Sequence, residues 1–83
     1  MDRAEVLSSI KDSAVEVLSV DPDQVTEEAR FKEDLEADSL DLVELVMALE
    51  ESFDISVPEE ELENVTTVGQ AVDLVVAKVS ANT

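Results

Sequence analysis

Three segments of the chain repeat apolar residues at the three- and four-residue spacing of an amphipathic helix. Each repeat follows a pair of polar residues that suits a helix N-terminus: Asp2 with Glu5, Asp38 with Asp41, and Thr67 with Gln70. The apolar residues assigned to the three buried stripes are Leu7, Ile10, Ala14, Val17 and Leu18, then Leu42, Val46, Leu49 and Phe53, then Val68, Val72, Val75 and Val79. No segment shows the alternation typical of a strand. The sequence therefore predicts an all-α protein.

Proline residues set the expected boundaries. The first helix should end near Val20, because Pro22 disfavours helical geometry in the residue before it and cannot donate to the helix ladder. A loop of about sixteen residues should follow, which is long for a compact domain. The loop's apolar residues should attach it to the core, and they are Val25, Ala29, Phe31 and Leu35. Pro58 suits the first position of a short third helix containing Glu59 to Leu62.

These elements predict one small four-helix bundle, with three main helices, one short helix and a long loop between the first and second helices. We assign residues 1–83 to a single domain, since 83 residues suffice for one modest core. Gly69 falls in the first turn of the last helix, where it should weaken the helix slightly. Fourteen residues are Val and only Phe31 and Phe53 are aromatic. Such an interior can simply fill a small core, or it can part to admit a flexible hydrocarbon chain.

Acidic residues are concentrated in one half of the chain. The sequence has 22 acidic and 5 basic residues, a formal net charge of −17. Fourteen of the acids lie between Lys32 and Lys78, an interval without Lys or Arg. This excess repels nucleic acid and anionic membranes, and it favours partners that present Lys and Arg. The acids can form a solvated face or an electrostatic docking surface centred on the second helix, and we favour the docking surface.

Composition also excludes several classes of protein. An apolar content of 45% argues against a disordered acidic tail. The absence of Cys excludes a disulfide framework and a thiolate metal site, and no acidic run has the spacing of a metal-binding loop. The N-terminus lacks the pattern of a signal peptide, and no apolar run approaches membrane-spanning length. We expect a cytoplasmic monomer without a metal site.

Ser39 lies where the acidic loop meets the second predicted helix, so its hydroxyl should be exposed at the first turn. The chain contains no His and no Cys. Ser39 therefore has no imidazole in its own chain to activate it, as a catalytic serine would need. This argues that another protein acts on Ser39, that the serine is an attachment point, and that the chain is not an enzyme.

The run from Asp34 to Glu51, which contains Asp38-Ser39-Leu40, resembles the signature of the discrete (type II) acyl carrier proteins of bacterial fatty acid synthesis, members of the phosphopantetheine-binding carrier family. The similarity continues through Phe53, the Val57-Pro58 step and residues 65–68, so it covers nearly the whole chain. The resemblance implies that Ser39 carries 4′-phosphopantetheine, derived from coenzyme A, in a phosphodiester. The terminal thiol of this arm would hold acyl groups as thioesters, and a chain without Cys must import such a thiol.

The same resemblance implies that the chain tethers a growing acyl group and presents it to enzymes in turn. The implied partners are a phosphopantetheinyl transferase (holo-carrier synthase), ketoacyl synthases, reductases, a dehydratase and acyl transferases, each docking through a basic patch. The residues expected to contact them are Asp38, Leu40, Asp41, Val43, Glu44, Met47, Glu50, Glu51 and Val57. Weak, salt-sensitive docking suits a carrier that must leave one partner for the next.

Two residues depart from the family pattern, and two other functions stay open. Glu36 stands where most members have Gly, which tolerates backbone angles that Glu resists. Leu42 replaces a more usual polar residue, so the face beside Ser39 should be more apolar. One alternative is a polyketide, peptidyl or D-alanyl carrier protein. The other, of a different class, is an unmodified acidic helical protein-binding module.

Overall fold

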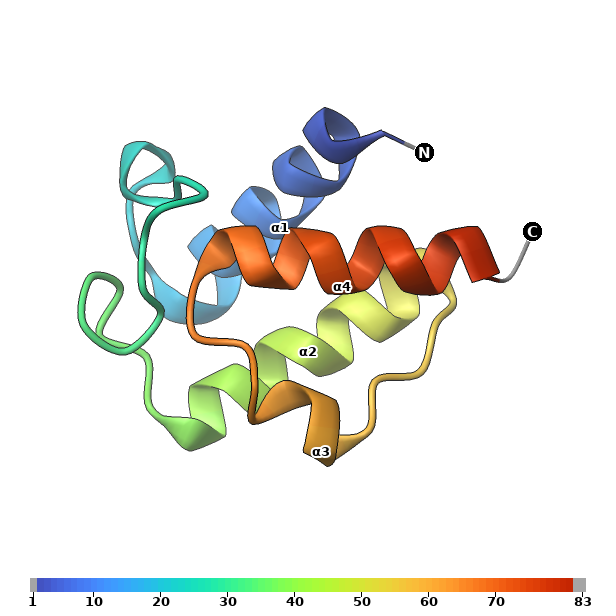
Figure 1. Ribbon diagram of the computed structural model, residues 1–83. Coiled ribbons are helices and arrows are strands. Elements are labelled where there is room, and N and C mark those ends of the chain that lie inside the picture. The colour runs from blue at the N-terminus through green and yellow to red at the C-terminus, as the bar shows by residue number, and fades with distance from the viewer. Residues whose placement is uncertain (1, 82–83) are drawn as a thin grey trace.

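The computed structural model describes residues 2–81, and these form a small helical bundle (Figure 1). Its elements are α1 (Arg3–Leu18), the 3-10 helix η1 (Pro22–Gln24), α2 (Ser39–Phe53), α3 (Glu59–Leu62) and α4 (Val68–Ala81). Helix α1 packs against both α2 and α4, and the short α3 lies between α2 and α4 along the chain. Over residues 2–81, β geometry is confined to an isolated antiparallel bridge between Arg30 and Thr67. The predicted all-α bundle of three long helices and one short helix is confirmed. None of the described helices is both long and apolar enough to cross a membrane.

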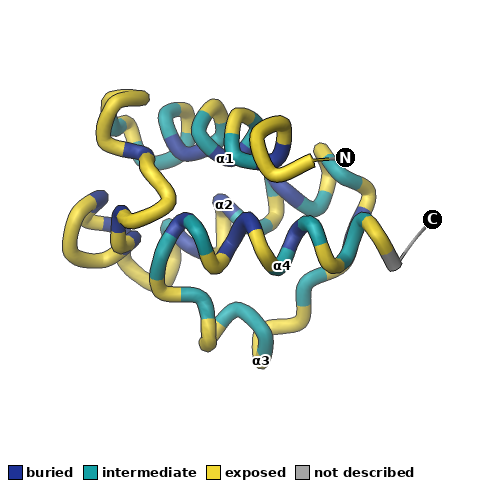
Figure 2. The backbone as a smooth tube through the Cα atoms, turned by 45° about the horizontal axis from the view of Figure 1, so that its top comes forward, coloured by how far each residue is buried: buried dark blue, intermediate teal, exposed yellow. Residues whose placement is uncertain are grey.

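The core lies between the three long helices, whose inner sides are buried (Figure 2). The predicted stripes are partly wrong in their rotation. In α1 the buried residues are Val6, Ile10 and Ala14, whereas Leu7, Val17 and Leu18 are only partly buried. In α2 Leu45 is buried with Leu42 and Leu49, whereas Val46 and Phe53 are half-buried. In α4 the stripe is buried except at Val79, which is partly buried. A helix that contacts two neighbours buries the arc between them, so residues at the edges of that arc keep some exposure.

Two helix boundaries differ slightly from those predicted. Helix α1 ends at Leu18 because Ser19 adopts a left-handed conformation with φ of 57°. The Ser19 N–H donates to the Val15 carbonyl at 3.1 Å, which closes the helix before Pro22 is reached. Pro58 is the residue before α3 and not its first residue. At the start of α1, the Asp2 carboxylate accepts the Glu5 N–H at 3.0 Å, as expected of a cap.

The segment of residues 19–38 is attached to the core through all four of the residues predicted to do this. Val25, Ala29, Phe31 and Leu35 are buried, and so is Ala37. The segment also runs beside the start of α4, where Phe31 N–H donates to the Thr66 carbonyl at 3.1 Å and Val68 N–H donates to the Ala29 carbonyl at 2.9 Å. These hydrogen bonds explain how so long a connection keeps a defined path.

Gly69 has a larger role than the slight weakening expected from its place in a helix. Its N–H donates to the Glu27 carbonyl at 2.9 Å. A Cβ at this position would lie 2.9 Å from the same carbonyl oxygen, closer than real Cβ contacts allow. Glycine is therefore needed here because the loop backbone approaches the helix backbone directly.

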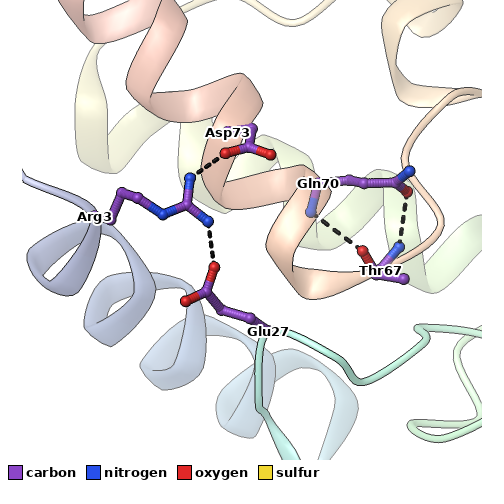
Figure 3. A network of polar contacts seen from close by, with 5 residues as sticks. All are labelled: Arg3, Glu27, Thr67, Gln70 and Asp73. Carbon is purple, nitrogen blue, oxygen red and sulfur yellow. Dashed lines mark hydrogen bonds and ion pairs between the residues drawn. The ribbon is translucent and has the colours of Figure 1, made fainter.

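A network of polar side chains joins α1, residues 19–38 and α4 on the surface (Figure 3). The Arg3 guanidinium donates to carboxylates of Glu27 and Asp73, and these hydrogen bonds, first that of Glu27, raise the pKa of Arg3. Beside this network, the Gln70 N–H donates to Thr67 Oγ1 at 3.2 Å, and the Thr67 N–H donates to Gln70 Oε1 at 3.1 Å. The capping box predicted for the last helix is confirmed.

Candidate functional site

Ser39 is the first residue of α2 and is exposed. Asp38 precedes it as the N-cap: the Asp38 carboxylate accepts the Asp41 N–H at 2.9 Å, and the Asp41 carboxylate accepts the Asp38 N–H at 3.3 Å. The predicted N-cap Asp38 is confirmed, and the reciprocal hydrogen bond from the Asp38 N–H to Asp41 completes a capping box that determines where the helix begins. The Ser39 hydroxyl has no hydrogen-bond partner among residues 2–81. The Ser39 hydroxyl oxygen is therefore free to react with a group that another molecule brings to it.

A cavity of about 350 Å³ opens beside Ser39, and we call it the outer cavity. Its lining includes Ser39 together with the apolar side chains of Phe31, Leu42, Leu62 and Val65. A second, apolar cavity of about 20 Å³, the inner cavity, shares those four apolar residues and extends between α2, α3 and α4. These four shared side chains lie between the two cavities, and we call the line through them, from Ser39 toward the centre of the bundle, the apolar path.

Leu42 belongs to this path and not to the outer surface. It is only 7% exposed and lines both cavities. Leu42 therefore makes the lining beside Ser39 apolar, as expected, and its predicted place in the buried stripe of α2 is confirmed. The reason is its position three residues after Ser39, which turns it toward the core side of α2, in line with Leu45 and Leu49.

The apolar residues predicted to dock partners remain exposed on α2. Leu40 is 68% exposed, Met47 59% and Val43 40%. They recur at spacings of three and four residues, so they share one side of the helix, which we call the docking face. Of the acidic residues predicted to accompany them, Asp38, Glu44 and Glu51 are exposed, and Asp41 is half-buried.

Glu50 and Val57 differ from the other predicted docking residues. Both are half-buried, and the Glu50 Oε2 atom accepts the Val57 N–H at 2.9 Å. This bond ties the end of α2 to the connection that leads into α3. Part of the Glu50 carboxylate is thus used inside the molecule, and Val57 lines the inner cavity.

Three of the basic residues form ion pairs, all away from α2. Arg3 pairs with Glu27 and Asp73, as Figure 3 shows. The other pairs are Arg30 with Glu33 at 2.6 Å and Lys78 with Glu61 at 2.7 Å. None of the ion pairs found within residues 2–81 includes an α2 carboxylate, so the negative charge of this helix is left for partners from outside.

Sequence reasoning missed two cations beside the site. Arg30 and Lys32 line the outer cavity together with Ser39. The hydrogen bond that the Arg30 guanidinium donates to the Glu33 carboxylate raises the pKa of Arg30. The distance of seven residues between Lys32 and Ser39 was visible in the sequence, but the direction of the intervening turns was not.

Glu36 adopts a left-handed conformation although Glu was expected to resist the backbone angles that Gly tolerates. Its φ is 55°, in the region that L side chains avoid and glycine accepts. The backbone path before Ser39 therefore requires the glycine-like conformation although the residue is Glu.

Comparison with known proteins agrees with this arrangement. The model of the family described as "Phosphopantetheine attachment site" matches residues 8–75. The chain is 58% identical over 76 residues to an acyl carrier protein of Rubrobacter xylanophilus, covering 92% of this chain and 94% of that protein. It is 49% identical over 81 residues to an acyl carrier protein of Thermosynechococcus vestitus, covering 98% and 100%.

A solved structure agrees as well. The acyl carrier protein from Enterococcus faecalis superposes with a TM-score of 0.77 at 37% identity, covering 94% of this chain and 99% of that one. The family match spans more than half of the chain, and each of these relatives is matched over nearly its whole length. The chain belongs to the phosphopantetheine-binding family of acyl carrier proteins.

Proposed function

We propose that this chain carries acyl groups as thioesters on a 4′-phosphopantetheine arm joined to Ser39, and that it presents them to the enzymes of fatty acid synthesis. It acts as a single carrier domain in the cytoplasm and not as an enzyme. The observation that carries this proposal is the position of Ser39: an exposed first-turn residue with an unbonded hydroxyl, at a cavity that adjoins an apolar interior.

The residues around Ser39 fit the arm. A phosphodiester on the Ser39 oxygen lies at the N-terminus of α2, where free N–H groups and the helix dipole favour negative charge. The chain has no His, so we expect the transferase that attaches the arm to take the hydroxyl proton. The outer cavity offers about 350 Å³ beside the attachment point. When bound, the arm supplies the thiol that this chain lacks.

The apolar path from the outer to the inner cavity gives the cargo a place inside the bundle. Each methylene removed from water there contributes about 0.8 kcal/mol. The inner cavity holds only about 20 Å³, so an acyl chain can enter only if the surrounding helices move apart. Helix α3 is suited to move, because none of its four residues is fully buried (Figure 2).

The docking face of α2 meets the partners. Its exposed acids, of which Glu44 is central, steer basic patches on the transferase and the synthesis enzymes and raise the rate of association. Val43 and Met47 then supply a small apolar contact that sets the register of the complex. Because the acids are exposed, the attraction weakens in salt, which lets the carrier leave one enzyme for the next.

Intact mass tests the attachment. Wild type, Ser39→Ala and the control Ser52→Ala, an exposed serine on the same helix, are incubated with coenzyme A and a phosphopantetheinyl transferase. The wild type and Ser52→Ala should each gain the mass of one arm, and Ser39→Ala should gain none while keeping its helical content. A mass gain on Ser39→Ala would show that the site is elsewhere. No gain on the wild type with a competent transferase would favour the unmodified binding module.

A kinetic salt series tests the docking face. Glu44→Lys should slow transferase turnover most at low salt, with the defect shrinking as salt screens the wild-type attraction. Met47→Ala should give a defect that depends little on salt, because an apolar contact is not screened. Glu16→Lys, an exposed acid of α1, is the control for net charge. If Glu16→Lys slows turnover as much as Glu44→Lys, net charge alone explains the effect and the docking face is misassigned.

A further inference from the structure

Two of the five basic residues line the outer cavity that contains Ser39, and they are Arg30 and Lys32. The Arg30 guanidinium is already engaged, since it donates to the Glu33 carboxylate at 2.6 Å. Lys32 is exposed, and its ammonium has no hydrogen bond or ion pair with any residue of the described range 2–81. An uncommitted cation therefore stands at the same cavity as the attachment point.

The other charges around Ser39 are negative. Asp38 and Asp41 flank it at the helix start, and Glu44 follows on the exposed side of α2. A phosphodiester directed over the docking face would meet carboxylates, which raises its electrostatic energy. A phosphodiester directed into the outer cavity meets Lys32 and Arg30, but also Glu33, Glu59 and Glu63 of the same lining. The cavity is therefore less negative than the docking face, and Lys32 is its cation without an ion pair within residues 2–81.

We propose that Lys32 is a positioning residue that holds the phosphodiester of the arm on Ser39 and turns the arm into the outer cavity, away from the docking face. This inference rests on the proposed attachment at Ser39. Lys32 offsets the repulsion from Asp38 and Asp41, whereas the charge of Arg30 is balanced by its ion pair with Glu33. The arm then starts on the path that leads to the inner cavity, and Leu40 and Met47, which do not line the outer cavity, stay uncovered for partners, whereas Val43 borders both the cavity and the docking face.

The arrangement also gives a way to release the arm. Lys32 is exposed, so its attraction for the phosphodiester is modest and screened by salt. A partner that brings Lys or Arg to the docking face competes for the same anion. Docking would then draw the start of the arm out of the cavity and toward the partner.

The test compares apo and holo forms of wild type, Lys32→Gln and Lys11→Gln. Lys11, on α1, makes no ion pair within residues 2–81 either, so its substitution removes the same charge at a residue that does not line the outer cavity. For each protein we compare the melting temperature of the holo form minus that of the apo form. At low salt this difference should be higher in wild type than in Lys32→Gln by roughly 1–4 °C. Lys11→Gln should behave as wild type, and the difference should shrink in high salt.

Amide chemical shifts supply a readout that overall stability does not affect. On conversion from apo to holo, the cavity-lining amides of Glu63 and Thr66 should shift in wild type and Lys11→Gln, and much less in Lys32→Gln. Equal shifts and equal melting differences in all three proteins would overturn the inference while the attachment stands. If no protein gains the mass of the arm, the proposed function fails and the inference fails with it.

Discussion

The two segments that connect the long helices are built differently. Residues 19–38, between α1 and α2, bury five apolar side chains: Val25, Ala29, Phe31, Leu35 and Ala37. Residues 54–65, which lead from α2 through α3, bury only Ile55. Both segments line the cavities beside Ser39, the first through Phe31 and the second through Leu62 and Val65. The cavities therefore have two different walls. The wall formed by residues 19–38 is part of the core, and the wall formed by residues 54–65 packs only against the edge of the core.

The polar contacts of the two segments differ in the same sense. Residues 19–38 are joined to the start of α4 by backbone hydrogen bonds, including that of Gly69 N–H to the Glu27 carbonyl at 2.9 Å. Residues 54–65 follow α2 with backbone hydrogen bonds of Asp54 and Ile55 to the Glu50 carbonyl. Side chains tie them further, Glu50 to the Val57 N–H and, toward α4, Lys78 to Glu61. Segments with few buried apolar contacts open at lower free energy than the core. We expect the α3 side to yield when cargo enters and residues 19–38 to stay in place.

The largest effect should come from truncating a leucine in each segment. Leu35→Ala should lower the free energy of unfolding by about 2–5 kcal/mol, because Leu35 is 3% exposed and its loss leaves a cavity. Leu62→Ala should cost about 1 kcal/mol or less, since Leu62 is half-buried and borders space that already exists. Urea unfolding of both variants measures the difference. Equal losses would mean that the two walls are equally part of the core.

Gly69→Ala tests the backbone contact that fixes residues 19–38 to α4. At an ordinary helical position this change stabilises by about 1 kcal/mol, because Ala is the better helix former. Here the new Cβ would lie 2.9 Å from the Glu27 carbonyl oxygen, so the change should instead destabilise by about 1–3 kcal/mol. The measurement is the free energy of unfolding of Gly69→Ala relative to wild type, and its sign shows whether the backbone contact resists the new Cβ. A stabilised variant would show that the segment moves aside easily and that the comparison between the two walls is wrong.

These contacts also explain which parts of the molecule could be predicted from the sequence. Helical periodicity and caps are local signals, so the helices, the Asp38 and Thr67 caps and the position of Ser39 followed from them. The rotation of α1 and α2 depends on two neighbours at once, so Val6 and Leu45 were missed as core residues. The approach of Glu27 to Gly69 and of Lys32 to the Ser39 cavity depends on the path of a long loop, which no local pattern encodes.

Glu36→Gly, also within residues 19–38, should stabilise the protein, by less than Leu35→Ala or Gly69→Ala destabilises it. Glu36 has φ of 55°, and an L side chain in this conformation is strained where glycine is not. Allowing for the greater freedom of glycine in the unfolded chain, we expect a gain of about 0.5–1 kcal/mol. The control Glu28→Gly removes the same charge at an exposed residue without positive φ and should destabilise. A loss of stability in Glu36→Gly as large as in the control would refute strain at this residue.

The smallest change in the free energy of unfolding should come from breaking the ion pair of Lys78 with Glu61, and its consequences should be confined to α3. The two side chains are 28% and 40% exposed, so Lys78→Gln should lower the free energy of unfolding by only about 0.2–1 kcal/mol. Its main consequence should be faster hydrogen exchange at the amides of α3, with exchange in residues 19–38 unchanged, because the pair ties α3 to α4 and touches nothing in the other segment. Lys11→Gln controls for the lost positive charge, and adding Glu61→Gln to Lys78→Gln should cause little further change, since the partner is already gone. If exchange rises equally in both segments, the bundle loosens as a whole and α3 is no more movable than the rest. If it rises in α3 alone, the ion pair is the contact that must break before cargo can widen the inner cavity.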